Sequence, residues 1–499
     1  MKFTSSRLAV AATLALTASS SFAALSDYTP GPGVTDIYLA GSSAVDLALT
    51  KFIAQACTPG TLNVYRSDAG VKTYYLWTCQ SGSFGTANSK LAIHKNTNSS
   101  GDGVALLQPA TGATVAFLGV SDLSNLAGCT TTAVPAALGI PAYNVNTCGA
   151  SVGTAGTGTT LAKPQLGFTD SEPAQFGTAA APASNVVGAV PFGLIFGIPV
   201  SKTLRNALQD VQFPGNTFTV ADRELEVNMP NVASAQINAI FTGRYSNWTA
   251  AMGVTLPDNN IYKVRRSNTS GTTRIFNATF VGEFCVPGVA PASTGTAITN
   301  PAAECLNAAP RTKQAATSDD MAACISKYDT QGLGAIGHLS TDYQPTAGDG
   351  YRFVKVDGYV PKLLNVIDNK YKMWSELSMN YPVGLAPTGD LLAFYTRFQA
   401  ASNDAAYLSA VDTGLTQPLG GWVGGVVGVV PNNKNVTLGL NWGLQITPGL
   451  NVLRTDASVL AYPSSAVTRA TSSGYNLCAP LYNAVPFPVA NPAVGYQAQ

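Results

Sequence analysis

The densest group of residues able to bind an anion lies at 264–273, Val-Arg-Arg-Ser-Asn-Thr-Ser-Gly-Thr-Thr. An apolar segment ends at Arg266, and a helix is predicted to begin at Ser270. Backbone N–H groups at a helix start lack partners within the helix and lie at the positive end of its dipole. Arg266 would add a planar charged fork, and Gly271 would let an anion approach the backbone. The hydroxyls of Ser270 and Thr272 would add donors for a tetrahedral oxyanion, although either residue could simply cap the helix.

Two other loops combine small residues and hydroxyls at predicted strand-to-helix junctions. Gly-Ser-Ser at 41–43 follows the first predicted strand, and Asn-Ser-Ser-Gly-Asp-Gly at 98–103 precedes a predicted helix start at Val104. In an open α/β sheet, ligands bind beyond the carboxyl ends of the strands, where such junctions meet. The three loops together therefore predict one anion site.

A carboxylate could select a protonated oxyanion, because it accepts from an O–H and repels a fully ionised anion. Asp170, in Gly-Phe-Thr-Asp-Ser-Glu-Pro at 167–173, is our candidate, and Asp122 is the alternative. Asp170 could also be an exposed turn residue with no such role.

Strands and helices are predicted to alternate along the chain, which favours parallel sheets built from βαβ units. Strands are expected at 36–40, 90–95 and 186–200, and helices at 233–241 and 273–284, with another beginning at Ser43. Residues 125–165 are predicted to form a surface insertion. The tail from about Leu415 is predicted to add β structure, with alternating residues at 435–442.

The N-terminus has the pattern of a secretory signal, with Lys2 and Arg7, an apolar run and a small-x-small site ending at Ala23. The eight cysteines include no C-x-x-C pair, and an even number in an exported chain favours disulfides. We expect local bridges Cys57–Cys79 and Cys129–Cys148. No later segment has the length of apolar sequence needed to span a bilayer.

Composition excludes several other classes. The 28 basic and 27 acidic residues give no strong field for nucleic acid or an anionic membrane. Two histidines exclude a multi-histidine metal site, and no cofactor or metal is expected. No G-x-S-x-G elbow occurs, and His94 and His338 are interpreted as structural. An enzyme is therefore not expected, and phosphoester hydrolysis is the less favoured alternative.

Taken together, these segments resemble the periplasmic phosphate-binding proteins of bacterial ABC importers, the PstS-like class II solute-binding proteins. The segment at 36–49 resembles that family's first loop, G-A-G-A-T-F-P, while 98–104 resembles its G-S-S-G-G-V loop and 167–173 its G-A-S-D-x-P segment. Residues 266–272 resemble R-x-D-G-S-G-T, with Asn268 replacing an aspartate. The resemblance runs in order from about residue 36 to about 400, with large insertions at 57–95 and 120–165.

The resemblance implies phosphate ligands at matching positions. Ser43 stands at the family's threonine and Ala44 where a phenylalanine is usual, while Ser99 or Ser100 stands at its ligand serine. Asp170 stands at the phosphate-accepting aspartate. The implied set is Ser43, Ala44, Ser99, Asp170, Arg266, Ser270, Gly271 and Thr272.

The resemblance also implies an α/β fold of two lobes joined by two crossovers, with phosphate held between them. Lobe one would comprise 24–190 and 343–499, with the C-terminal extension from about 400, and lobe two would comprise 191–342. A periplasmic or secreted monomer that supplies an ABC permease is the expected function. A secreted surface or matrix protein that reuses the scaffold is the alternative from another class.

Overall fold

The computed structural model describes residues 25–427 except 70–71, 98, 108–113, 124–128, 138, 149–159, 177–185, 190–192, 284–294, 308, 369, 402–403, 414–416, 421, 423 and 425, and then 467–468, 470–471, 474–475 and 482–483. The predicted signal segment at 1–23 and the alternating segment at 435–442 lie outside the described residues.

Two sheets carry the fold. The first has the strand order β10-β20-β9-β1-β4-β3-β2-β7-β6. Its strands are β1 (Val34–Gly41), β2 (Asn63–Ala69), β3 (Lys72–Gln80), β4 (Lys90–Thr97), β6 (Cys129–Val134), β7 (Tyr143–Cys148), β9 (Leu166–Thr169), β10 (Val186–Ala189) and β20 (Ser378–Pro382). The pairs β1–β4, β1–β9 and β2–β7 are parallel, whereas β3 runs antiparallel to β2 and β4. The expected parallel pairs are therefore present but are mixed with antiparallel ones, because hairpin connections bring neighbouring strands back in the opposite direction.

The second sheet has the order β12-β18-β11-β16-β13-β15-β14, and β17, β19 and β21 also pair with β11. Its strands are β11 (Gly193–Ser201), β12 (Asn231–Val232), β13 (Tyr262–Arg266), β14 (Thr296–Ile298), β15 (Thr312–Ala315), β16 (Ala335–Ile336), β17 (Leu339–Ser340), β18 (Tyr351–Val356), β19 (Trp374–Glu376) and β21 (Val426–Val427). Smaller pairs are β5 (Val115–Phe117) with β8 (Thr160–Ala162), β22 (Val467–Thr468) with β25 (Tyr482–Asn483), and β23 (Ala470–Thr471) with β24 (Gly474–Tyr475).

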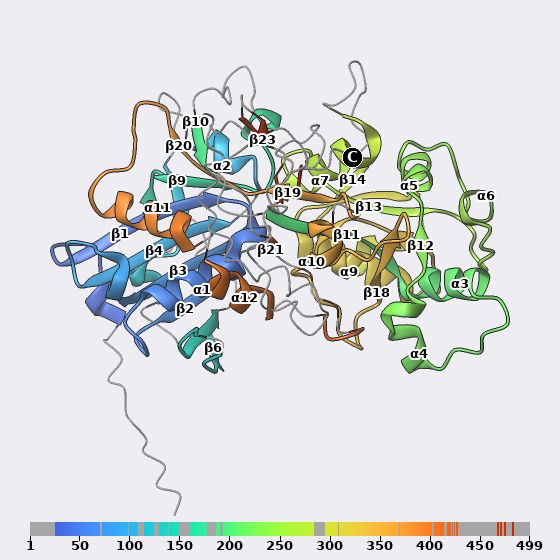
Figure 1. The fold of residues 1–499 in the computed structure, drawn as a ribbon, viewed down its shortest axis with the longest axis horizontal. Coiled ribbons are helices and arrows are strands. Elements are labelled where there is room, and N and C mark those ends of the chain that lie inside the picture. Colours follow the sequence, from blue (N-terminus) through green and yellow to red (C-terminus); the bar gives the residue numbers. More distant parts are fainter. Residues whose placement is uncertain are drawn as a thin grey trace, which may run out of the picture.

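The chain crosses from the first sheet to the second between β10 and β11, and it returns between β19 and β20. The predicted two-lobed α/β architecture is confirmed, with a mainly blue first lobe and a green-to-yellow second lobe in Figure 1. The single strand predicted at 186–200 is in fact two strands, one in each sheet, because an apolar run does not encode which sheet it joins. β18 pairs with β11 and β12, so the second sheet continues beyond residue 342, the predicted end of lobe two.

Helices cover the sheets of both lobes. They are α1 (Asp46–Ala56), α2 (Asp102–Ala105), α3 (Lys202–Gln212), α4 (Val220–Glu224), α5 (Ser234–Phe241), α6 (Trp248–Met252), α7 (Gly271–Phe276), α8 (Pro301–Glu304), α9 (Ser318–Asp329), α10 (Leu363–Ile367), α11 (Gly389–Ala401) and α12 (Ala405–Thr413). Phe52 of α1 packs against Phe394 and Phe398 of α11, with ring centroids 5.7 and 4.9 Å apart. Helices far apart in the sequence thus share the core that holds the first sheet.

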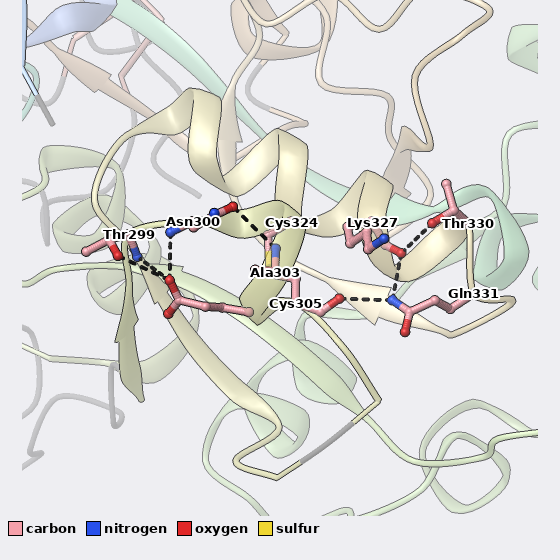
Figure 2. Close-up of a disulfide and its surroundings, with 9 residues drawn as sticks. Thr299, Asn300, Ala303, Cys305, Cys324, Lys327, Thr330 and Gln331 are labelled. Carbon is pink, nitrogen blue, oxygen red and sulfur yellow. Dashed lines mark hydrogen bonds between the residues drawn. A yellow bond between two sulfur atoms is a disulfide. The ribbon is translucent and has the colours of Figure 1, made fainter. Parts of the chain in front are cut away.

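Three disulfides join cysteines of the described chain. The predicted bridges Cys57–Cys79 and Cys129–Cys148 are both present, and the segment predicted as a surface insertion supplies β6 and β7 to the first sheet. A third bridge, Cys305–Cys324, ties the end of α8 to α9 (Figure 2). Beside it, the side chain of Gln331 donates to the carbonyl of Cys305 at 2.9 Å. This bridge fixes the helix whose first residue, Ser318, contacts the candidate site.

Candidate functional site

The first predicted loop lies at the carboxyl end of β1, where the chain enters the short 3₁₀ helix η2 (Ser43–Val45). The Ser42 N–H donates to the carbonyl of Phe168 at 2.9 Å, and the Ser42 hydroxyl accepts from the Ala44 N–H at 3.2 Å. Gly41 has a φ of 104°, and a Cβ there would lie 2.2 Å from the Phe168 carbonyl. Only glycine fits this approach, which brings the first loop against the strand that precedes Asp170.

The second loop places Ser100 against Asp170. Ser99 and Ser100 are both buried, and their carbonyls accept from the N–H groups of Asp102 and Gly103 at 3.0 Å as α2 begins. The Ser100 hydroxyl donates to Oδ1 of Asp170. Of the two serines left open by the sequence, Ser100 is therefore the one that meets the carboxylate, while the role of Ser99 stays a prediction.

Asp170 lies just past β9 and is only 3% exposed. Burial raises the pKa of its carboxyl group, whereas hydrogen bonds from Ser100 and Ser42 and the nearby charge of Arg266 oppose that rise. The alternative candidate, Asp122, accepts from the Gly119 N–H at 2.6 Å within its own turn. Asp170 is thus the carboxylate that the described contacts place among the predicted loops.

Arg266 lies at the carboxyl end of β13, which is parallel to β15 and β16. It is 5% exposed. Its Nε donates to the carbonyl of Ala316 at 3.1 Å, and a terminal nitrogen donates to the Ser318 hydroxyl at 2.6 Å. Burial lowers the pKa of Arg266, and nearby acidic groups, including Asp170, counter this effect. Both hydrogen-bonding partners are uncharged, so they orient the guanidinium without neutralising it.

The first residue of α7, in the second lobe, lies against Asp170 and Ser100 of the first lobe. A Cβ on Gly271 would lie 1.4 Å from Oδ1 of Asp170 and 2.6 Å from the Ser100 hydroxyl oxygen. The Gly101 N–H also donates to the carbonyl of Thr269 at 2.9 Å, which joins loops from the two lobes directly. Glycine at 271 is therefore required by close approach, and the lobes are closed on each other here.

Ser270 does not cap α7 through its side chain, which was the alternative role that the sequence allowed for this residue. This residue is the N-cap of α7, but its side chain makes no capping hydrogen bond. Ser270 and Thr272 are both buried, at 3% and 4% exposure. The predicted helix at 273–284 begins earlier, at Gly271, and passes into a π-helical turn at Asn277–Val281.

The structure thus brings Ser100, Asp170 and Gly271 together, with Arg266 close enough to affect the pKa of Asp170. Ser43 and Ala44 lie on the loop that packs against the strand preceding Asp170. No described contact joins either residue to Arg266. Buried donors held on rigid elements around one carboxylate are suited to holding an oxyanion that carries a proton.

Sequence reasoning missed the groups that hold these loops in place. Lys95 is completely buried in β4, and its ammonium group donates to the carbonyl of Ser42 at 2.8 Å and to Asp46 at 2.6 Å. Ser318, which orients Arg266, lies 52 residues further along the chain. A lysine two residues after the apolar run at 91–93 of a predicted strand was the available signal, since a buried charge requires a nearby partner.

Comparisons with known proteins give partial likenesses. No protein-family model matches the chain, and no curated protein matches it. Among solved structures, it is similar to a proposed phosphate ABC transporter substrate-binding protein with bound phosphate from Clostridium perfringens, at 13% identity and a TM-score of 0.41, covering 78% of this chain and 99% of that one. It is also similar to an ABC-type phosphate transport receptor from Vibrio cholerae, at 13% identity and a TM-score of 0.35, covering 73% and 94%. PstS from Borrelia burgdorferi gives 10% identity, a TM-score of 0.35 and coverage of 76% and 97%. At these identities and TM-scores, the likeness concerns the course of the backbone.

Neither a membrane-spanning helix nor a metal-binding cluster is found among the described residues. No described helix has both the length and the apolar character needed to cross a membrane. Within the same residues, no group of three or more His, Cys, Asp or Glu side chains is placed to hold a metal ion.

Proposed function

We propose that the chain binds inorganic phosphate between its two lobes, outside the cytoplasm, for uptake by an ABC-type importer. The meeting of Ser100, Asp170 and Gly271 beside the buried Arg266 is the observation that carries the proposal. Phosphate there would receive charge-assisted hydrogen bonds from a guanidinium, hydroxyls and helix-start amides, and its own O–H would donate a hydrogen bond to Asp170.

The proposed ligands come from both lobes, so binding would favour the closed arrangement. Opening for entry and release would be a hinge motion about the segments that connect the two lobes. The proposed phosphate-binding residues are Ser43, Ala44, Ser99, Asp170, Arg266, Ser270, Gly271 and Thr272, with Ser100 positioning Asp170.

A binding protein fits this group of residues better than an enzyme. A carboxylate, hydroxyls and a guanidinium hold an oxyanion, whereas hydrolysis would also need an activated nucleophile or a metal-bound water. The disulfides among the described cysteines support an oxidising, extracytoplasmic location. A monomer in the periplasm that delivers phosphate to a permease is the proposed setting.

Selectivity between oxyanions tests the proposal. In calorimetric titrations at neutral pH, phosphate and arsenate, which carry a proton, are expected to bind at least about a hundredfold more tightly than sulfate. Sulfate has no proton to donate, so its negative charge would face the Asp170 carboxylate without a hydrogen bond between them. Asp170→Asn should weaken phosphate binding and reduce this preference, because the amide can donate to sulfate.

Asp122→Asn is the matched control, since it makes the same change at the other candidate carboxylate. It should leave the preference for phosphate intact. Equal affinity of the unaltered protein for sulfate and phosphate would contradict the proposal. A preference lost in Asp122→Asn and kept in Asp170→Asn would overturn the choice of carboxylate.

A further inference from the structure

A cleft of about 350 Å³ adjoins the candidate phosphate site, and Ser43 lies on its wall. Its other walls come from the start of α1, from β2, β3 and β7, and from segments of the second lobe. These three strands lie in the parts of the sequence that we interpreted as insertions. The insertions therefore extend the first sheet into a surface beside the site.

The strand register explains why one face of this sheet lines the cleft. Tyr75 of β3 pairs with Arg66 of β2, and Arg66 pairs in turn with Thr147 of β7. In the next row, Thr73 of β3 pairs with Thr97 of β4. Directly paired residues share a face, and so do residues two apart on a strand, so all five side chains lie on the same face. That face offers hydroxyl groups, a phenol ring and a guanidinium.

The second lobe closes the cleft with acidic and phenolic groups. Asp319, Asp342 and Tyr343 line this side. Asp319 lies 3.8 Å from the Arg66 guanidinium, which links the extended sheet to the second lobe. Oδ1 of Asp342 is buried and has no hydrogen-bond partner among the described residues. Burial raises the pKa of Asp342 to about 7, so near neutral pH its carboxyl group can accept or donate a hydrogen bond. The cleft thus contains a buried polar atom that still lacks a hydrogen-bond partner.

The chemistry of the lining favours a neutral group with many hydroxyls. Such a group can donate to carboxylate oxygens and accept from threonine hydroxyls, while its carbon skeleton packs on a tyrosine ring. Two positive groups beside the cleft already pair with acids, Arg66 with Asp319 and Lys95 with Asp46, so neither is left to balance a second anionic group. Because the cleft reaches Ser43, a ligand could place one end in it and a phosphoryl group in the candidate site.

Building on the proposed function, we propose that this cleft is a subsite for the hydroxyl-rich organic group of a phosphate monoester. Its phosphoryl group would occupy the candidate phosphate site and donate a hydrogen bond through its O–H to Asp170. The protein would then take up sugar or polyol phosphates in preference to inorganic phosphate.

Calorimetric titration of the full chain with inorganic phosphate, glycerol 3-phosphate, glucose 6-phosphate and phosphocholine tests this inference. The titrations are run at pH 6, because the second pKa of a phosphate monoester lies near 6 and the protonated monoanion is then well populated. Glycerol 3-phosphate or glucose 6-phosphate is expected to bind at least tenfold more tightly than inorganic phosphate. Thr147→Trp should remove this advantage and leave the affinity for inorganic phosphate within about twofold, because Thr147 is exposed on the outer wall.

Thr217→Trp, at an exposed threonine between α3 and α4 that does not line the cleft, is the matched control and should leave both affinities unchanged. Inorganic phosphate binding as tightly as the polyol phosphates would overturn the inference and leave the proposed function standing. Tighter binding of phosphocholine would also overturn it, in favour of a cationic group. A Thr147→Trp variant that still binds a polyol phosphate tenfold more tightly than inorganic phosphate would also overturn the inference. If none of these ligands binds, the proposed function itself fails.

Discussion

Replacing Arg266 with alanine is expected to weaken phosphate binding by about a hundredfold, or roughly 3 kcal/mol. The guanidinium is buried, and its described hydrogen bonds go to the uncharged oxygens of Ala316 and Ser318. Its positive charge therefore remains to stabilise a bound anion, and no nearby water could fully replace it in a buried site. Isothermal titration calorimetry of the two proteins measures the difference.

Two further variants separate the charge from its geometry. Arg266→Lys should recover part of the loss, because lysine keeps the charge but not the planar fork. Arg244→Ala, at an exposed arginine of the second lobe, should bind phosphate like the unaltered protein. Phosphate affinity in Arg266→Ala within threefold of the original would contradict the role that we propose for this residue.

Gly271→Ala is expected to weaken phosphate binding by about a hundredfold while changing the melting temperature little. The added methyl group would lie 1.4 Å from the Asp170 carboxylate oxygen, far inside van der Waals contact. Overpacking of this kind costs about 1 to 3 kcal/mol, and here the lobes can relieve it by failing to close. The binding-competent closed form would then be depleted. Calorimetry gives the affinity, and thermal unfolding monitors the fold.

Gly348→Ala is the matched control. This glycine lies in an exposed turn of the second lobe, and the atom nearest to its added methyl group would be 3.9 Å away. It should change neither affinity nor stability. Normal phosphate affinity in Gly271→Ala would show that the contact between α7 and Asp170 is not part of the binding-competent form.

The loops of the candidate site could be predicted because their signals are local. An apolar strand, a polar loop and a helix start follow one another within about ten residues at Arg266 and at Gly41, and the structure has β13 with α7 and β1 with η2 at these places. The carboxyl ends of neighbouring strands then bring such loops together. The sequence could not show that Ser100, and not Ser99, donates to Asp170, since both serines precede the same helix.

Long-range partners could not be predicted in the same way. Nothing near Arg266 in the sequence indicates that Ser318 orients it, and the pairing of Cys305 with Cys324 was one of many possible connectivities. The run at 186–200 is apolar throughout, so its division between two sheets depends on partners elsewhere in the chain. The predicted signal peptide and much of the tail lie outside the described residues, and their roles stay predictions.

The most direct test of the phosphate site is a crystal structure with bound arsenate, whose arsenic atom is located by anomalous scattering. Arsenate has the shape and protonation of phosphate. We expect one arsenic peak between the lobes. The arsenate oxygens should lie within hydrogen-bonding distance of Asp170, Arg266 and the first residues of α7. An arsenic peak elsewhere, with these three groups unliganded, would contradict it.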